Sequence, residues 1–115
     1  MHSFTEENYL KAIYKLQETN GEVVATSALA QVMGVHSPSV TDMLKSMASK
    51  NLVIYQKSKG FKLTEKGRQV AVGIVRKHRL WEVFLVDKLG FRWDEVHNIA
   101  EELEHIASEE LIMRL

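Results

Sequence analysis

The sequence predicts a mainly α-helical fold in which a winged helix-turn-helix domain precedes a helical domain. Helical periodicity covers most of the 115 residues, a glycine-centred helix-turn-helix pattern lies near residue 34, and one short β-prone stretch follows it. Apolar residues make up 45% of the chain and charged residues 26%, the balance of a globular protein. We expect the first domain to span residues 1–63 and the second to span residues 64–115.

The first two helices are recognised by their end signals. Thr5 is a good N-cap for an amphipathic helix over 6–19, which the following Asn-Gly pair ends. Thr26 or Ser27 can cap a short second helix, and Gly34 closes it. A glycine suits this position because the turn needs a positive φ.

The third helix completes the helix-turn-helix pattern. Ser37 is expected to cap it and Pro38 suits its first turn. Ala30 and Gly34 let two helices cross closely, and Val40 points back into their crossing. In this motif the outer face of the third helix enters the DNA major groove. The residues predicted to face DNA from these two helices are Thr26, Ser27, His36, Ser37, Pro38, Ser39, Thr41, Asp42 and Lys45.

A small hairpin should follow and form the wing. Two β-prone runs over 52–55 and 61–63 flank a turn that carries Lys57 and Lys59, both suited to the sugar-phosphate backbone. From residue 34 to residue 68, seven basic residues stand against two acidic ones, a net charge of +5. Such a surface suits a polyanion. The alternative is that the motif is plain packing and the charge is only solvated.

The second domain is expected to contain three helices. Thr64 can cap a long one that ends near Leu89 before Gly90, and the next should begin near Trp93 or Asp94. Ser108 can cap a last helix that is unfinished at residue 115, which indicates a truncated protein or a helix that packs on a partner. From residue 91 to residue 115, seven acidic residues stand against two basic ones, a net charge of −5 that suits a cation.

Histidines and carboxylates of these helices indicate a metal site. At about 100° per residue, four such side chains of the fifth helix share an arc of roughly 100°, and two more lie four residues apart on the fourth helix. The six are His78, Glu82, His97, Glu101, Glu104 and His105. Mixed nitrogen and oxygen donors suit a divalent ion. Taken singly, the glutamates could form a solvated face and His78 could be a core histidine.

Several motifs are distinctive, namely those in residues 7–14, 36–41, 63–67 and 76–80, with Glu101, Glu104 and His105. In these stretches, which cover nearly the whole chain, the sequence resembles the metal-dependent repressors of the diphtheria toxin repressor family, especially their manganese-responsive branch. The resemblance implies a winged-helix domain, a helical dimerisation domain and metal binding at their junction. It also implies homodimers on palindromic operators that usually repress metal-uptake genes. Larger members carry a third, small β-barrel domain.

The family's metal ligands carry over residue by residue. The resemblance implies that His78, Glu82 and His97 form an ancillary site, and that Glu101, Glu104 and His105 form the primary cluster. Glu101 stands where the iron-responsive branch has cysteine, which favours Mn²⁺. Two positions on the first helix depart from the pattern. Asn8 replaces a methionine or aspartate ligand, and Lys11 replaces a glutamate and cannot ligate a metal.

We therefore expect a transcriptional repressor with Mn²⁺, or Fe²⁺, as the co-repressor that orders a homodimer on operator DNA. Metal joining the fourth and fifth helices to the first would fix the two DNA-reading heads about one helical turn apart. The alternative is a metal-independent winged-helix regulator that answers to a small organic ligand. An enzyme is disfavoured because the chain lacks a His-Glu-x-x-His helix. The absence of cysteine, of a secretory signal and of an apolar stretch of ~20 residues favours the cytoplasm without membrane contact.

Overall fold

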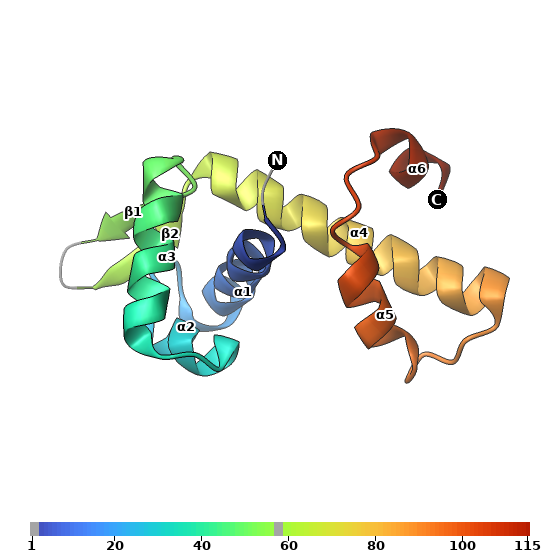
Figure 1. The fold of residues 1–115 in the computed structure, drawn as a ribbon, viewed down its shortest axis with the longest axis horizontal. Coiled ribbons are helices and arrows are strands. Elements are labelled where there is room, and N and C mark those ends of the chain that lie inside the picture. Colours follow the sequence, from blue (N-terminus) through green and yellow to red (C-terminus); the bar gives the residue numbers. More distant parts are fainter. Residues whose placement is uncertain (1–2, 57–58) are drawn as a thin grey trace. The chain divides into compact units, whose positions relative to one another are not determined.

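The computed structural model describes residues 3–56 and 59–115, and these divide into two compact units, the first ending at Val72 and the second spanning Gly73–Leu115. The first unit contains α1 (Phe4–Asn20), α2 (Thr26–Met33), α3 (Ser37–Ser49), β1 (Val53–Gln56) and β2 (Gly60–Leu63). Helix α4 (Glu65–Leu89) runs from the first unit into the second, which adds α5 (Val96–Leu103) and α6 (Glu109–Arg114). Figure 1 shows this order of elements along the chain. The mainly helical class and the two-stranded wing are confirmed.

The first unit is built around one apolar core. Leu10 and Ile13 of α1, Leu29 of α2 and Val40 and Leu44 of α3 are each at most 1% exposed. Gly34 adopts φ 68°, and its left-handed conformation lets the chain turn sharply from α2 into α3. The helix-turn-helix geometry inferred from the glycine and from the buried stripe of α3 is confirmed.

The wing is larger than the sequence indicated. β1 and β2 pair antiparallel with Val53 opposite Leu63, and Val24 adds a bridge to Phe61 through two backbone hydrogen bonds of 2.7 and 2.9 Å. Gly60 permits this third segment to approach, because a Cβ at that position would collide with the Val24 carbonyl. The segment before α2 therefore ties the wing to the helices.

Three of the predicted N-caps were wrong. The side chain that caps α1 belongs to Ser3, which accepts a hydrogen bond from the Glu6 backbone at 3.1 Å, so Thr5 lies inside the helix. Ala25 and His36 precede α2 and α3 without a side-chain cap. Each helix begins at the predicted cap residue or one residue before it, so the predicted caps lie inside the helices. Thr64 and Ser108 do cap α4 and α6, through the Gly67 and Leu111 amides.

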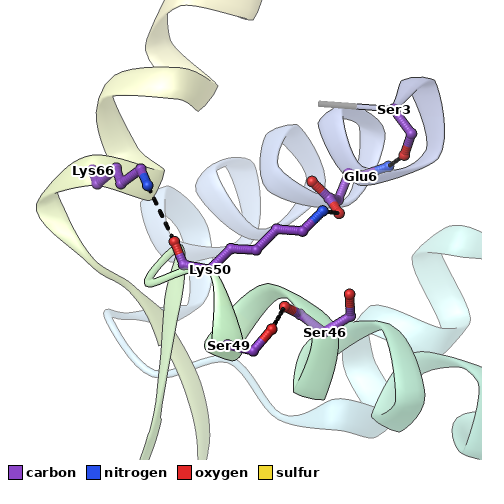
Figure 2. A network of polar contacts seen from close by, with 6 residues as sticks. All are labelled: Ser3, Glu6, Ser46, Ser49, Lys50 and Lys66. Atoms are coloured by element: carbon purple, nitrogen blue, oxygen red, sulfur yellow. Dashed lines mark hydrogen bonds and ion pairs between the residues drawn. The ribbon is translucent and has the colours of Figure 1, made fainter. Parts of the chain in front are cut away.

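A polar network links α1 to the end of α3 (Figure 2). Glu6 is buried, with 4% of its surface exposed, and its carboxylate lies 2.6 Å from the Lys50 ammonium. Lys66 donates to the Lys50 carbonyl at 3.2 Å, which connects the start of α4 to the same place. The pattern of the sequence did not predict this pair, because its partners are 44 residues apart.

The second unit packs one face of α4 against α5. Ile74, Trp81 and Leu85 are buried on α4, and Val96 and Ala100 are buried on α5. The Lys77 side chain donates to the Ile106 carbonyl at 3.3 Å and holds the segment that follows α5. None of the helices in the described part of the chain is long and apolar enough to cross a bilayer.

Candidate functional site

The site in the second unit starts from the packed face of α4. His78 is four residues after Ile74 and three before Trp81, so helical spacing turns its imidazole toward the residues packed on that face. Its side chain is 13% exposed, as this spacing predicted. Glu82 follows one helical turn later, and its Oε2 lies 3.3 Å from Nε2 of His78. These two side chains form one edge of the site.

His97 supplies the opposite edge from the first turn of α5. Its ring stands edge-on to that of His78, with 5.0 Å between the centroids. One donor atom from each of His78, Glu82 and His97 lies within 4.8 Å of the others. Two imidazole nitrogens and one carboxylate oxygen at this separation can converge on a divalent cation.

Glu104 supports this trio from the end of α5. Its side chain is fully buried, and its Oε1 lies 2.7 Å from Nδ1 of His78. An ionised carboxylate can only accept, so Nδ1–H donates to it and the other ring nitrogen is directed toward Glu82. A histidine that ligates a metal is typically held in this way by a carboxylate on its second nitrogen.

The remaining two predicted residues extend the same chain of contacts. Glu101 reaches Nε2 of His97 at 3.2 Å, and its side chain is 48% exposed. His105 is buried, with its Nε2 3.8 Å from Oε2 of Glu104. All six predicted residues of the second unit are thus connected by contacts between neighbouring side chains.

The prediction that one helical arc carries four of these residues was wrong. Helix α5 begins at Val96, later than expected, and ends at Leu103, so Glu104 is its C-cap residue and His105 lies in the turn beyond. Both of these side chains are buried, while His97 and Glu101 are exposed. The alternative that the glutamates form a solvated helix face therefore fits Glu102, which is exposed, and is wrong for Glu104, which is buried.

Asn8 and Lys11 belong to the first unit. Asn8 lies on α1 and is partly buried, and Lys11 is buried on the same helix with 8% exposure. The assignment of Asn8 as a ligand stays a prediction from the resemblance.

The DNA-facing prediction concerns the outer surface of the helix-turn-helix. Seven of its residues are exposed on α2, on α3 or just before α3, and Thr26 and Thr41 are partly buried. The exposed ones are Ser27, His36, Ser37, Pro38, Ser39 and Asp42, joined by Lys45 one turn further on. Lys59 is exposed in the wing turn, and Lys57 lies outside the described residues.

Sequence reasoning missed two exposed apolar side chains of the wing. Ile54 and Tyr55 on β1 are 46% and 57% exposed, and the Tyr55 ring lies 5.2 Å from that of Phe61. Their β-propensity predicts the strand, but it does not predict which face of a two-stranded wing is covered.

Two family models match the chain. Residues 1–61 match the N-terminal DNA binding domain of iron dependent repressors, and residues 64–115 match their metal binding and dimerisation domain. The iron-dependent repressor IdeR of Mycobacterium tuberculosis is 38% identical over 111 residues, which are 96% of this chain and 48% of that protein. This chain therefore spans about half the length of such curated relatives.

Shorter and solved relatives agree with this match. An uncharacterized HTH-type transcriptional regulator of Methanocaldococcus jannaschii is 35% identical over 95% of this chain and 87% of its own length. A solved manganese-dependent transcriptional repressor in complex with manganese is 41% identical, with a TM-score of 0.82, over 95% of this chain and 50% of that one. These relatives are transcriptional regulators rather than enzymes. The chain belongs to the family of iron dependent repressors, with both its DNA-binding and its metal-binding and dimerisation domains.

Proposed function

We propose that this chain is a transcriptional repressor that binds operator DNA as a homodimer when a divalent cation, Mn²⁺ in preference to Fe²⁺, occupies the site on α4 and α5. The observation that carries the proposal is the convergence of three donor atoms, from His78, Glu82 and His97, within 4.8 Å of one another. Membership in the family supports the link between that site and DNA binding. Operator binding puts the proposed activity in the cytoplasm.

The donor set fits a hard or borderline cation. Imidazole and carboxylate suit Mn²⁺ and Fe²⁺, and the chain has no cysteine to favour a softer ion. We propose His78, Glu82 and His97 as direct ligands, with Glu104 orienting His78 through its 2.7 Å contact. The resemblance implies a second group of ligands, Glu101, Glu104, His105 and Asn8, and in that group Glu104 would bind the cation through the carboxylate oxygen that does not accept from His78. A relative solved with manganese supports the choice of metal.

The proposed role of the site is to restrain the second unit. When bound, the cation supplies positive charge among Glu82, Glu101 and Glu104 and links α4 to α5. His78 and Glu82 lie on α4 and His97 lies on α5. A cation bound by all three would therefore oppose separation of the two helices. A ligand shifts a population only by its differential affinity for the two states, typically ~1–3 kcal/mol.

A second copy of the chain is the proposed partner of the second unit. Five of its large apolar side chains are exposed, namely Val83, Leu89, Trp93, Leu111 and Met113. Contact with a second copy would remove apolar area of these side chains from water. With two reading heads in one assembly, the operator should consist of two half-sites related by a two-fold axis. A functional boundary at residues 63/64 is part of this proposal, although the first turns of α4 pack with the first compact unit.

The test is a DNA-binding titration of the chain against duplexes selected from a random library in the presence of Mn²⁺. Fluorescence anisotropy should show tight binding with Mn²⁺, binding with anaerobic Fe²⁺ at higher metal concentration, and loss of binding on addition of a chelator. Light scattering in the same buffers should give the mass of a dimer. Affinity for DNA that does not respond to the metal or the chelator would contradict the proposal.

A cavity of the first unit favours the alternative of a metal-independent regulator that answers to a small organic ligand. The first unit has a surface cavity of about 440 Å³ lined in part by Tyr14, Gln17 and Arg68. A small molecule bound there could act on α1 and on the start of α4. Under that alternative, Arg68→Ala and Gln17→Ala would change the regulation of DNA binding while substitutions of His78 and His97 would not.

A further inference from the structure

The face of α3 directed away from the core has an acidic residue at its centre. Val40, Leu44 and Met47 are at most 1% exposed and define the buried face of this helix. At about 100° per residue, Asp42 lies about 200° around the helix from Val40, which places it opposite the buried stripe. Asp42 is exposed. In a helix-turn-helix, that outer face is the part that meets the base edges.

The Asp42 carboxylate has no hydrogen-bonding or ion-pair partner within the described part of the chain. Within residues 3–56 and 59–115, it makes no hydrogen bond and no ion pair, and neither does Lys45 three residues later. Pro38, one turn before it, has no polar side-chain atom, and Ser46, one turn after it, uses its carbonyl to accept from Ser49. A carboxylate without a partner on the face that meets DNA weakens the binding of DNA by repelling its phosphates, unless the carboxylate accepts a hydrogen bond from a base.

Only two bases offer such a donor in the major groove. Guanine presents the acceptors O6 and N7, and thymine presents the acceptor O4 and a methyl group, so both repel or ignore a carboxylate. Adenine has a donor at N6 beside an acceptor at N7, which opposes the second carboxylate oxygen. Cytosine presents the N4 donor without an adjacent acceptor on the same base, which makes it the best match for an aspartate.

We propose that Asp42 determines operator specificity by accepting a hydrogen bond from N4 of a cytosine in each half-site. This inference rests on the proposed function, because it assumes that α3 enters the operator. Lys45 fits the same interpretation. The guanine paired with that cytosine presents two acceptors, and an ammonium on the same helix face can donate to them or to the nearby phosphate.

The experiment compares the DNA sequences that the wild-type chain and the Asp42→Asn variant select from a random duplex library with Mn²⁺ present. The wild type should enrich cytosine at one position of each half-site. The amide side chain of the variant can pair with N6 and N7 of adenine, so the variant should enrich adenine there. On duplexes that differ at this position only, we expect about a tenfold preference for cytosine in the wild type and a reversal in the variant.

Two control variants separate base reading from charge. Asp42→Glu retains the carboxylate and should retain the preference for cytosine. Glu18→Gln makes the same change of charge as Asp42→Asn at an exposed position of α1, and it should leave the preference unchanged. Because Asp42 and Glu18 are exposed side chains on helix surfaces, circular dichroism should show the wild-type fold for each variant.

The outcomes distinguish this inference from the proposed function. If Asp42→Asn binds every duplex more tightly by the same factor and selects the wild-type motif, the carboxylate only repels phosphates and the inference is overturned. A swap from cytosine to adenine that occurs equally with chelator supports base reading by Asp42 and contradicts metal control. If the wild type selects no motif with or without Mn²⁺, both are contradicted.

Discussion

Nδ1 of His78 lies 2.7 Å from Oε1 of Glu104, a carboxylate with no exposed surface. This contact joins two residues 26 positions apart and fixes which nitrogen of His78 is directed toward Glu82 and His97. The buried acid therefore acts on the candidate metal site through the orientation of a single ring.

Glu104→Gln tests that relationship. The amide oxygen of glutamine can still accept from His78, so the fold should persist, but the loss of negative charge should lower Mn²⁺ affinity by about 10–100-fold. Titration calorimetry measures the affinity, and circular dichroism verifies the fold. The matched control is Glu102→Gln, two residues earlier and exposed, which should bind Mn²⁺ as the wild type does. Equal affinities in the two variants would remove Glu104 from the site.

His97→Ala separates metal binding from stability. The His97 side chain is 57% exposed, so its removal should change the free energy of unfolding by no more than about 0.5 kcal/mol. Mn²⁺ binding, followed by the quenching of tryptophan fluorescence, should nevertheless weaken by at least tenfold, because one of three converging donors is lost. The neighbouring Asn98→Ala variant is the control, since Asn98 is also exposed on α5. A variant that binds Mn²⁺ normally would contradict the proposed ligand set.

Lys50→Met tests the pair in Figure 2. The methionine keeps the aliphatic stem but removes the ammonium 2.6 Å from Glu6, whose side chain is only 5% exposed. We expect the free energy of unfolding to fall by about 1–3 kcal/mol, measured by urea denaturation, because a buried carboxylate loses its cation.

The double variant Glu6→Gln/Lys50→Met should recover part of that loss. If the double variant is destabilised by the sum of the two single changes, the two side chains are not energetically coupled.

Gly60→Ala tests the close approach of Val24 to the wing. The added Cβ would collide with the Val24 carbonyl, and Gly60 has φ 135°, a conformation that alanine rarely adopts. We expect a loss of at least about 2 kcal/mol in thermal or urea unfolding. Gly73→Ala on α4 is the control, because nothing lies within 4 Å of its added Cβ and alanine favours the helix by up to ~1 kcal/mol. Equal stability of the two variants would show that the wing tolerates displacement from Val24.

Local patterns in the sequence were sufficient for the order of the helices and for the two-stranded wing. The stripe of Val40, Leu44 and Met47 has helical spacing, so its burial follows from periodicity alone. His78 could be placed on the packed face of α4 for the same reason. Thr64 and Ser108 were found as caps because each stands directly before a helical pattern.

The tertiary structure decided the contacts between residues far apart in the sequence, which helical or strand periodicity does not indicate. Glu104 is fully buried and contacts His78, 26 positions away, because α4 and the end of α5 meet in space. The cap of α1, the Glu6–Lys50 pair and the Val24–Phe61 bridge likewise join residues whose proximity only chain folding creates. Periodicity records which side of an element is apolar, whereas the choice of partner across space depends on the sum of many distant contacts.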